Sequence, residues 1–76
     1  MGWCVDFESD QSVSLVHDEE YLLFAKRGVK KAEMTEWRFE LTDTASGEQL
    51  ISETRDISND QHLWSVLEKY KRLYPP

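Results

Sequence analysis

Apolar residues in the last twenty positions, "ISNDQHLWSVLEKYKRLYPP", recur at steps of three and four. This spacing places them on one stripe of an α-helix, so it predicts an amphipathic helix with a single buried face. Ser58 and Gln61 have the spacing of an N-terminal capping box, and Pro75 is expected to end the helix. The stripe consists of Leu63, Val66, Leu67, Tyr70 and Leu73.

The segment before this helix alternates with period two, which is typical of β-strands. In "EWRFELT" the apolar residues Trp37, Phe39 and Leu41 alternate with charged or polar neighbours, so they are expected to share one buried sheet face. The stretch "TASGE" then supplies turn residues, with Gly47 able to adopt a positive φ. We expect "QLISETR" to return as the partner strand of a hairpin.

The first third of the chain predicts a second hairpin. In "WCVDFES" the residues Trp3, Val5 and Phe7 alternate with polar neighbours and Cys4, which predicts a strand with these three side chains on one face. The stretch "SDQS" is expected to turn the chain into a strand at residues 13–16.

Residues 18–34 allow two interpretations. The run "YLLFAK" is a short apolar strand in one, which we favour, and the start of a helical face in the other. The helix would contain Gly28, which costs about 1 kcal/mol relative to alanine.

Together these elements predict an α+β fold: an antiparallel sheet of four to five strands with the C-terminal amphipathic helix packed on one face. The 76 residues are expected to form a single domain, since a chain of this length has room for one core only. Cys4 is the one cysteine, so no internal disulfide can form and a cytoplasmic location is expected.

Membrane association is not expected. The first ten residues lack the basic and apolar regions of a signal peptide, and the longest uncharged apolar run covers only residues 21–25. A transmembrane helix needs about 20 such residues.

Acidic residues dominate the charge, with 15 Asp and Glu against nine Lys and Arg and a net charge of −6. Residues 1–25 hold six acids and no Lys or Arg, whereas "KRGVKK" at 26–31 holds four basic residues. The basic run is expected to be a solvated surface or an internal counter-charge. Because nucleic-acid binding needs a broad basic face, we expect no direct binding to nucleic acid and instead a basic protein partner.

The six N-terminal acids are the candidate partner-binding residues. If the first strand continues toward Asp10, then Asp6, Glu8 and Asp10 share one face at steps of about 6.6 Å, a spacing similar to that of phosphates. The negative surface would be extended by the neighbouring turn residues Asp18, Glu19 and Glu20. The alternative is a solvated face that only keeps the protein soluble.

Two aromatic residues complete the predicted interface. Trp3 and Tyr74 are candidate exposed anchors, because the aromatic residues exceed what a small core can hide and Trp and Tyr often anchor interfaces. Trp37 is expected in the core instead.

No pattern indicates catalysis, a metal or a cofactor. The stretch "DFESD" resembles the start of a calcium loop, but Gln11 stands where that loop needs glycine and His17 where it needs glutamate. His17 and His62 are expected at the surface, and nothing near Cys4 in sequence activates a thiol. We therefore expect a protein that is not an enzyme.

Two functions fit these observations. The first is a small acidic inhibitor that occupies a basic, nucleic-acid-binding surface of a partner protein by placing carboxylates where phosphates would lie. The second is a structural or assembly subunit, either a homodimer joined through a sheet edge or the helix, or part of a larger complex.

Overall fold

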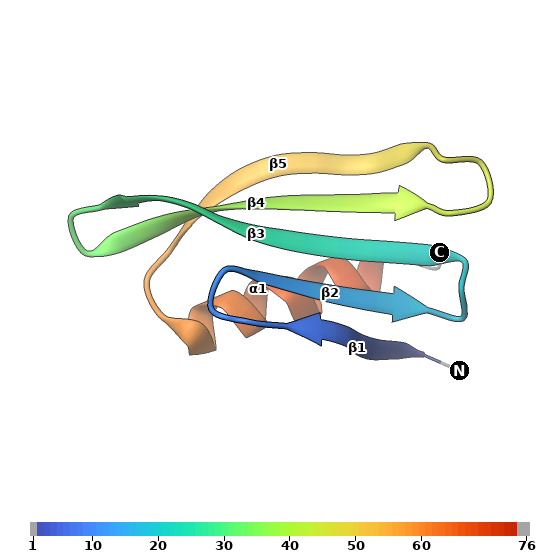
Figure 1. Cartoon of the computed structure of the whole chain (residues 1–76), viewed down its shortest axis with the longest axis horizontal. Coiled ribbons are helices and arrows are strands. Elements are labelled where there is room, and N and C mark those ends of the chain that lie inside the picture. Colours follow the sequence, from blue (N-terminus) through green and yellow to red (C-terminus); the bar gives the residue numbers. More distant parts are fainter. Residues whose placement is uncertain (1, 75–76) are drawn as a thin grey trace.

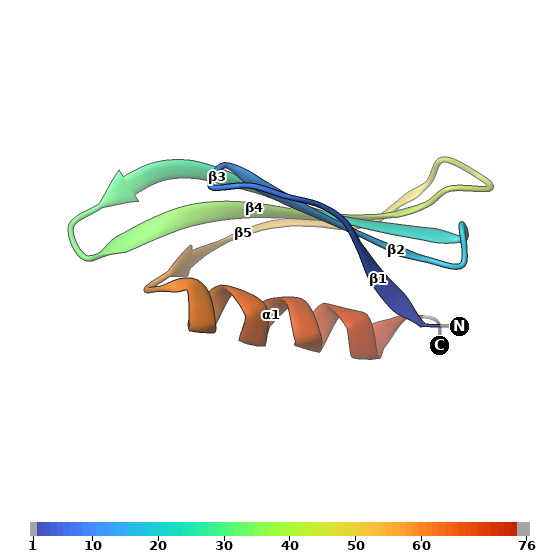
Figure 2. The ribbon, with the colours of Figure 1, turned by 60° about the horizontal axis from the view of Figure 1, so that its bottom comes forward.

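The computed structural model describes residues 2–74. In chain order these residues form β1 (Trp3–Glu8), β2 (Ser12–His17), β3 (Tyr21–Lys31), β4 (Met34–Asp43), β5 (Gln49–Ile57) and α1 (Asp60–Leu73). The strands form one antiparallel sheet in the order of the sequence, and Figure 1 shows β1 and β5 at its two edges. Figure 2 shows α1 lying along one face of the sheet. The predicted α+β fold is confirmed, with five strands among the described residues.

The core lies between α1 and the sheet. Leu15, Leu23 and Leu41 stand opposite one another on β2, β3 and β4, so the antiparallel register places their side chains in one row. Phe39 in the next row packs against the ring of Tyr70, with centroids 5.3 Å apart. The helix contributes its predicted stripe, of which these residues are buried: Leu63, Val66, Leu67 and Tyr70. Full burial of a large apolar side chain stabilises the fold by about 1.5–3 kcal/mol.

Residues 21–31 are a strand, as the favoured interpretation of this segment predicted. The register of β3 against β4 shifts between Arg27 and Lys30, which marks a bulge around Gly28. A Cβ atom at Gly28 would lie 3.0 Å from the carbonyl oxygen of Glu36. Glycine therefore permits the close approach of two backbones here, and does not interrupt a helix.

The start of β1 follows the predicted alternation as far as Val5, which lies opposite Leu15. The next paired residue is Phe7, opposite Ser14, so Asp6 is an extra residue in a β-bulge. Leu15 faces α1 and its neighbour Ser14 faces the other way, because successive strand side chains alternate.

This bulge changes the face of the residues that follow it. Phe7 lies on the sheet face that α1 leaves uncovered, so the prediction that it shares a face with Trp3 and Val5 is wrong. Glu8 stands opposite the core residue Val13 and therefore comes onto the helix side. Period-two reasoning cannot detect a bulge, because the inserted residue is polar and fits either face.

The helix begins one residue later than the predicted capping box implies. Asn59 is the N-cap, and its side chain accepts a 2.8 Å hydrogen bond from the backbone N–H of His62. The N–H of Ser58 donates to Nδ1 of His62 at 3.0 Å, so the Ser58 and Gln61 pairing is replaced by Asn59 and His62. Pro75, which was expected to end the helix, lies outside the described residues.

Candidate functional site

The β1–β2 hairpin and the turns at its two ends, residues 3–20, are called the acidic hairpin below. It carries six exposed carboxylates and no Lys or Arg. Its outer strand, β1, is an edge of the sheet (Figure 1); Asp6 and Glu8 lie on this strand, and the other four acids lie in the two turns. The six acids are Asp6, Glu8, Asp10, Asp18, Glu19 and Glu20.

The six acids are spread over the length of the acidic hairpin and do not form a regular row on one face. Glu8 and Asp10 lie toward one end of the hairpin, and residues 18–20 lie at the other end, because Trp3 stands opposite His17. Figure 1 shows the two turns at opposite ends of β2. Six strand residues span about 20 Å. The expected one-face row is broken because the strand ends at Glu8 and the bulge lies within it.

Ion pairs within the chain gather outside the acidic hairpin. Closely paired acids are found on β4 and α1: Glu36 with Lys31 at 3.1 Å, Glu40 with Arg38 at 2.8 Å, and Glu68 with Lys71 at 3.1 Å. In the acidic hairpin, Asp18 lies 3.5 Å from Nδ1 of His17. Within residues 2–74, no Lys or Arg forms an ion pair with the other five acids, which are Asp6, Glu8, Asp10, Glu19 and Glu20.

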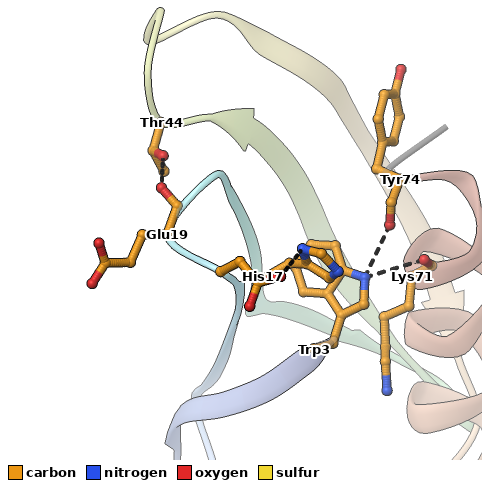
Figure 3. A network of polar contacts seen from close by, with 7 residues as sticks. Trp3, His17, Glu19, Thr44, Lys71 and Tyr74 are labelled. Atoms are coloured by element: carbon orange, nitrogen blue, oxygen red, sulfur yellow. Dashed lines mark hydrogen bonds and ion pairs between the residues drawn. The ribbon is translucent and has the colours of Figure 1, made fainter. Parts of the chain in front are cut away.

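Trp3 is half-buried and bridges the two ends of the described chain. Its indole Nε1 donates to the carbonyl oxygens of Lys71 at 3.1 Å and Tyr74 at 3.0 Å, as Figure 3 shows. Its ring also packs edge-on against His17, with centroids 5.4 Å apart. These contacts attach the first strand to the end of α1, so Trp3 has a structural role whether or not a partner contacts it.

Tyr74 is likewise half-buried, with its ring 5.6 Å from that of Tyr21. Thr44 holds the turn at residues 18–20 through two hydrogen bonds. Its hydroxyl donates to the carbonyl of Glu19, and its N–H donates to the carbonyl of Glu20 at 2.9 Å. Ring contacts connect Trp3, His17, Tyr21 and Tyr74 in series. Together with the Thr44 contacts, they fix the end of the acidic hairpin that holds residues 18–20 (Figure 3).

The basic run at residues 26–31 lies on β3. The Lys31 ammonium hydrogen-bonds Glu36, and this contact raises the pKa of Lys31. The Arg27 guanidinium lies over the ring of Trp37 at 6.0 Å. The Lys31 contact supports the interpretation of this run as an internal counter-charge for β4, whereas Arg27 contacts an uncharged ring.

A cavity lies at the other end of the acidic hairpin, between Glu8, Asp10 and the start of α1. No sequence pattern indicated it. Its residues come from β1, β2, β3, β4, α1 and a turn, so no spacing along the chain connects them. Trp64 and Asp60, which line it, both lie on α1.

Comparisons with protein families, with characterised proteins and with solved structures found no match to this chain. Within residues 2–74, no helix combines the length and apolar character needed to cross a membrane. In the same described part of the chain, no group of three or more His, Cys, Asp or Glu side chains is placed to hold a metal ion.

Proposed function

We propose that this chain is a small binding protein without catalytic activity, which docks on a basic surface of a partner protein through its acidic hairpin. The partner's surface is one that otherwise binds nucleic acid, so docking inhibits the partner by competition. Carboxylates along the edge of β1 occupy positions that phosphates would take.

One observation supports this proposal above the others. Glu36 and Glu40 on β4 and Glu68 on α1 have basic partners within the chain, whereas five acids of the acidic hairpin have none among the described residues. Because these carboxylates are exposed and belong to one hairpin, together they give this part of the surface a negative potential that can steer a basic partner. A net charge of −6 acts in the same sense.

The experiment compares three tagged proteins as baits in a native lysate: the wild type, Asp6→Lys with Glu20→Lys, and Glu33→Lys with Glu48→Lys. The two variants change the net charge equally, but only the first alters the acidic hairpin. We expect wild type and the second variant to retain a nucleic-acid-binding protein at about 0.05 M salt, and to release it at about 0.5 M salt. The first variant should not retain it.

Added DNA or RNA should displace the retained protein, because the two ligands compete for one basic surface. The proposal fails if the hairpin variant retains the partner as well as wild type does, or if nucleic acid and the chain bind that partner together. It also fails if the partner stays bound at the higher salt concentration, since screening weakens exposed charge contacts.

The second candidate function, an assembly subunit, is favoured by a different observation. The sheet face opposite α1 is uncovered and carries apolar side chains, among them Phe7, which is 54% exposed, and the half-buried Phe24. Such a face can join two copies of a chain.

A further inference from the structure

A cavity of about 460 Å³ opens beneath the β1–β2 turn, next to the N-terminal end of α1. Figure 2 shows that the start of β1 lies near the C-terminal end of α1. The other end of β1 lies with the rest of the sheet, farther from the helix. The cavity volume is within the range of about 300–1,000 Å³ typical of ligand sites. Its lining residues are Glu8, Ser9, Asp10, Val13, Arg27, Trp37, Asp60, Leu63 and Trp64.

The floor of the cavity is apolar and belongs to the core. Val13, Trp37 and Leu63 are each at most 5% exposed, so their positions are fixed by the core and only small parts of these side chains can reach a ligand. Trp64 is half-buried and supplies a second indole to the lining. A ligand that enters therefore meets chiefly the indole of Trp64, because the Arg27 guanidinium lies over the ring of Trp37.

The rim of the cavity is charged. Glu8, Asp10 and Asp60 contribute three exposed carboxylates, against the single guanidinium of Arg27. A rim with an excess of carboxylates repels anions and attracts cations. Indole rings bind organic cations such as guanidinium through cation–π contacts. The carboxylate rim and the indole together therefore favour a cation that has a planar or apolar group.

The chain's own Arg27 demonstrates this chemistry at the site. Its guanidinium carbon lies 6.0 Å from the centroid of Trp37, and its Nη1 donates to the backbone carbonyl of Asp10 at 3.4 Å. A second, smaller cavity of about 50 Å³ shares Arg27, Trp37 and Asp60 with the first. Arg27 therefore lines both openings.

We propose that this cavity receives one arginine side chain of the partner protein. The guanidinium would lie among the carboxylates of Glu8, Asp10 and Asp60, and its stem against the indole of Trp64. This inference rests on the proposed function, since it assigns to the acidic hairpin a specific anchor point on a basic partner. The nearby guanidinium of Arg27 repels the incoming guanidinium, so it lowers the affinity of the site for arginine.

The test uses the full chain and two peptides, acetyl-Gly-Arg-Gly-amide and the same peptide with citrulline, which is the neutral isostere of arginine. NMR spectra of the indole N–H groups report binding, and Trp3 serves as an internal control because its N–H is engaged with Lys71 and Tyr74. The arginine peptide should shift the Trp37 and Trp64 signals saturably, with a Kd on the order of 1 mM. The citrulline peptide should bind at least about tenfold more weakly.

Variants then assign the binding to the cavity. Asp60→Asn should weaken binding of the arginine peptide by about three- to tenfold, whereas Glu33→Asn, a matched loss of charge in the β3–β4 turn, should leave it unchanged. Arg27→Gln should tighten binding by about two- to fivefold, because it removes a like charge. Circular dichroism checks that each variant is folded.

The inference is overturned if the arginine peptide gives no saturable shift, if citrulline binds equally well, or if Glu33→Asn weakens binding as much as Asp60→Asn does. The proposed function is tested separately, because its variant changes Asp6 and Glu20, neither of which lines the cavity. If partner capture depends on Asp6 and Glu20 but the arginine peptide does not bind, the arginine site is contradicted and the proposed docking function is still supported.

Discussion

The hydroxyl of Tyr70 joins the helix to the edge strand β5. It donates a hydrogen bond to Glu53 Oε1 at 2.5 Å and accepts one from Arg55 Nε at 2.9 Å. Burial and the hydrogen bond donated to Glu53 raise the pKa of Tyr70 to about 12. The neutral phenol is thus the form that the folded protein favours.

This raised pKa predicts a loss of stability at high pH. Above pH 10.0, the ordinary pKa of tyrosine, the unfolded chain releases the phenol proton that the folded protein still holds. The free energy of unfolding should therefore fall as pH rises from about 10 to about 12, by up to about 1.4 kcal/mol per pH unit from this group. Urea unfolding of wild type and Tyr70→Phe over this range isolates the effect, and parallel pH profiles would contradict it.

Trp3 provides a second prediction at the scale of one residue. Trp3→Phe keeps a ring against His17 but removes the N–H that donates to the carbonyls of Lys71 and Tyr74. We expect a loss of about 1 kcal/mol of stability, with faster amide exchange in the last turn of α1. Unchanged exchange in that turn would show that the indole N–H does not hold the helix end.

At the scale of elements, α1 is the part that closes the core. Leu67 is 0% exposed and faces the sheet, whereas Leu73 on the same helix is 55% exposed. Leu67→Ala should lower the free energy of unfolding by about 2–5 kcal/mol, because it removes buried carbon and leaves a cavity. Leu73→Ala is the matched control and should change it by no more than about 0.5 kcal/mol. Urea unfolding measures both, and equal losses would mean that α1 does not pack as described.

The edge strand β1 shows how one inserted residue redirects a surface. Because Asp6 occupies a bulge, Glu8 lies on the helix side of the sheet, where it contributes to the cavity rim. Bulges at sheet edges also hinder pairing with another chain. The same feature therefore shapes the candidate site and protects the edge that carries it.

At the scale of the whole molecule, charge and apolar surface compete to set the oligomeric state. A net charge of −6 disfavours self-association, whereas the uncovered sheet face with Phe7 and Phe24 favours it. We expect the chain to elute from a sizing column as a monomer at about 0.05 M and about 0.5 M salt. A dimer at both salt concentrations would instead support the assembly subunit, since apolar contacts respond little to salt.

The sequence by itself determined most of the fold. Periods of 3.6 and 2.0 are local properties, so they identified α1, the β4–β5 hairpin, the two N-terminal strands and the buried Trp37. Composition also identified the acidic N-terminal third. These predictions succeeded because each depends on neighbouring residues and on the single core that 76 residues can build.

Only the tertiary structure decided how the charges and aromatic residues are placed. The bulge at Asp6 broke the expected row of acids, and the contacts of Trp3 with the helix end connect residues 68 or more positions apart. The cavity joins Asp10, Trp37 and Asp60 from separate elements. Such arrangements follow from sheet register and helix packing, which bring together residues that no local pattern relates.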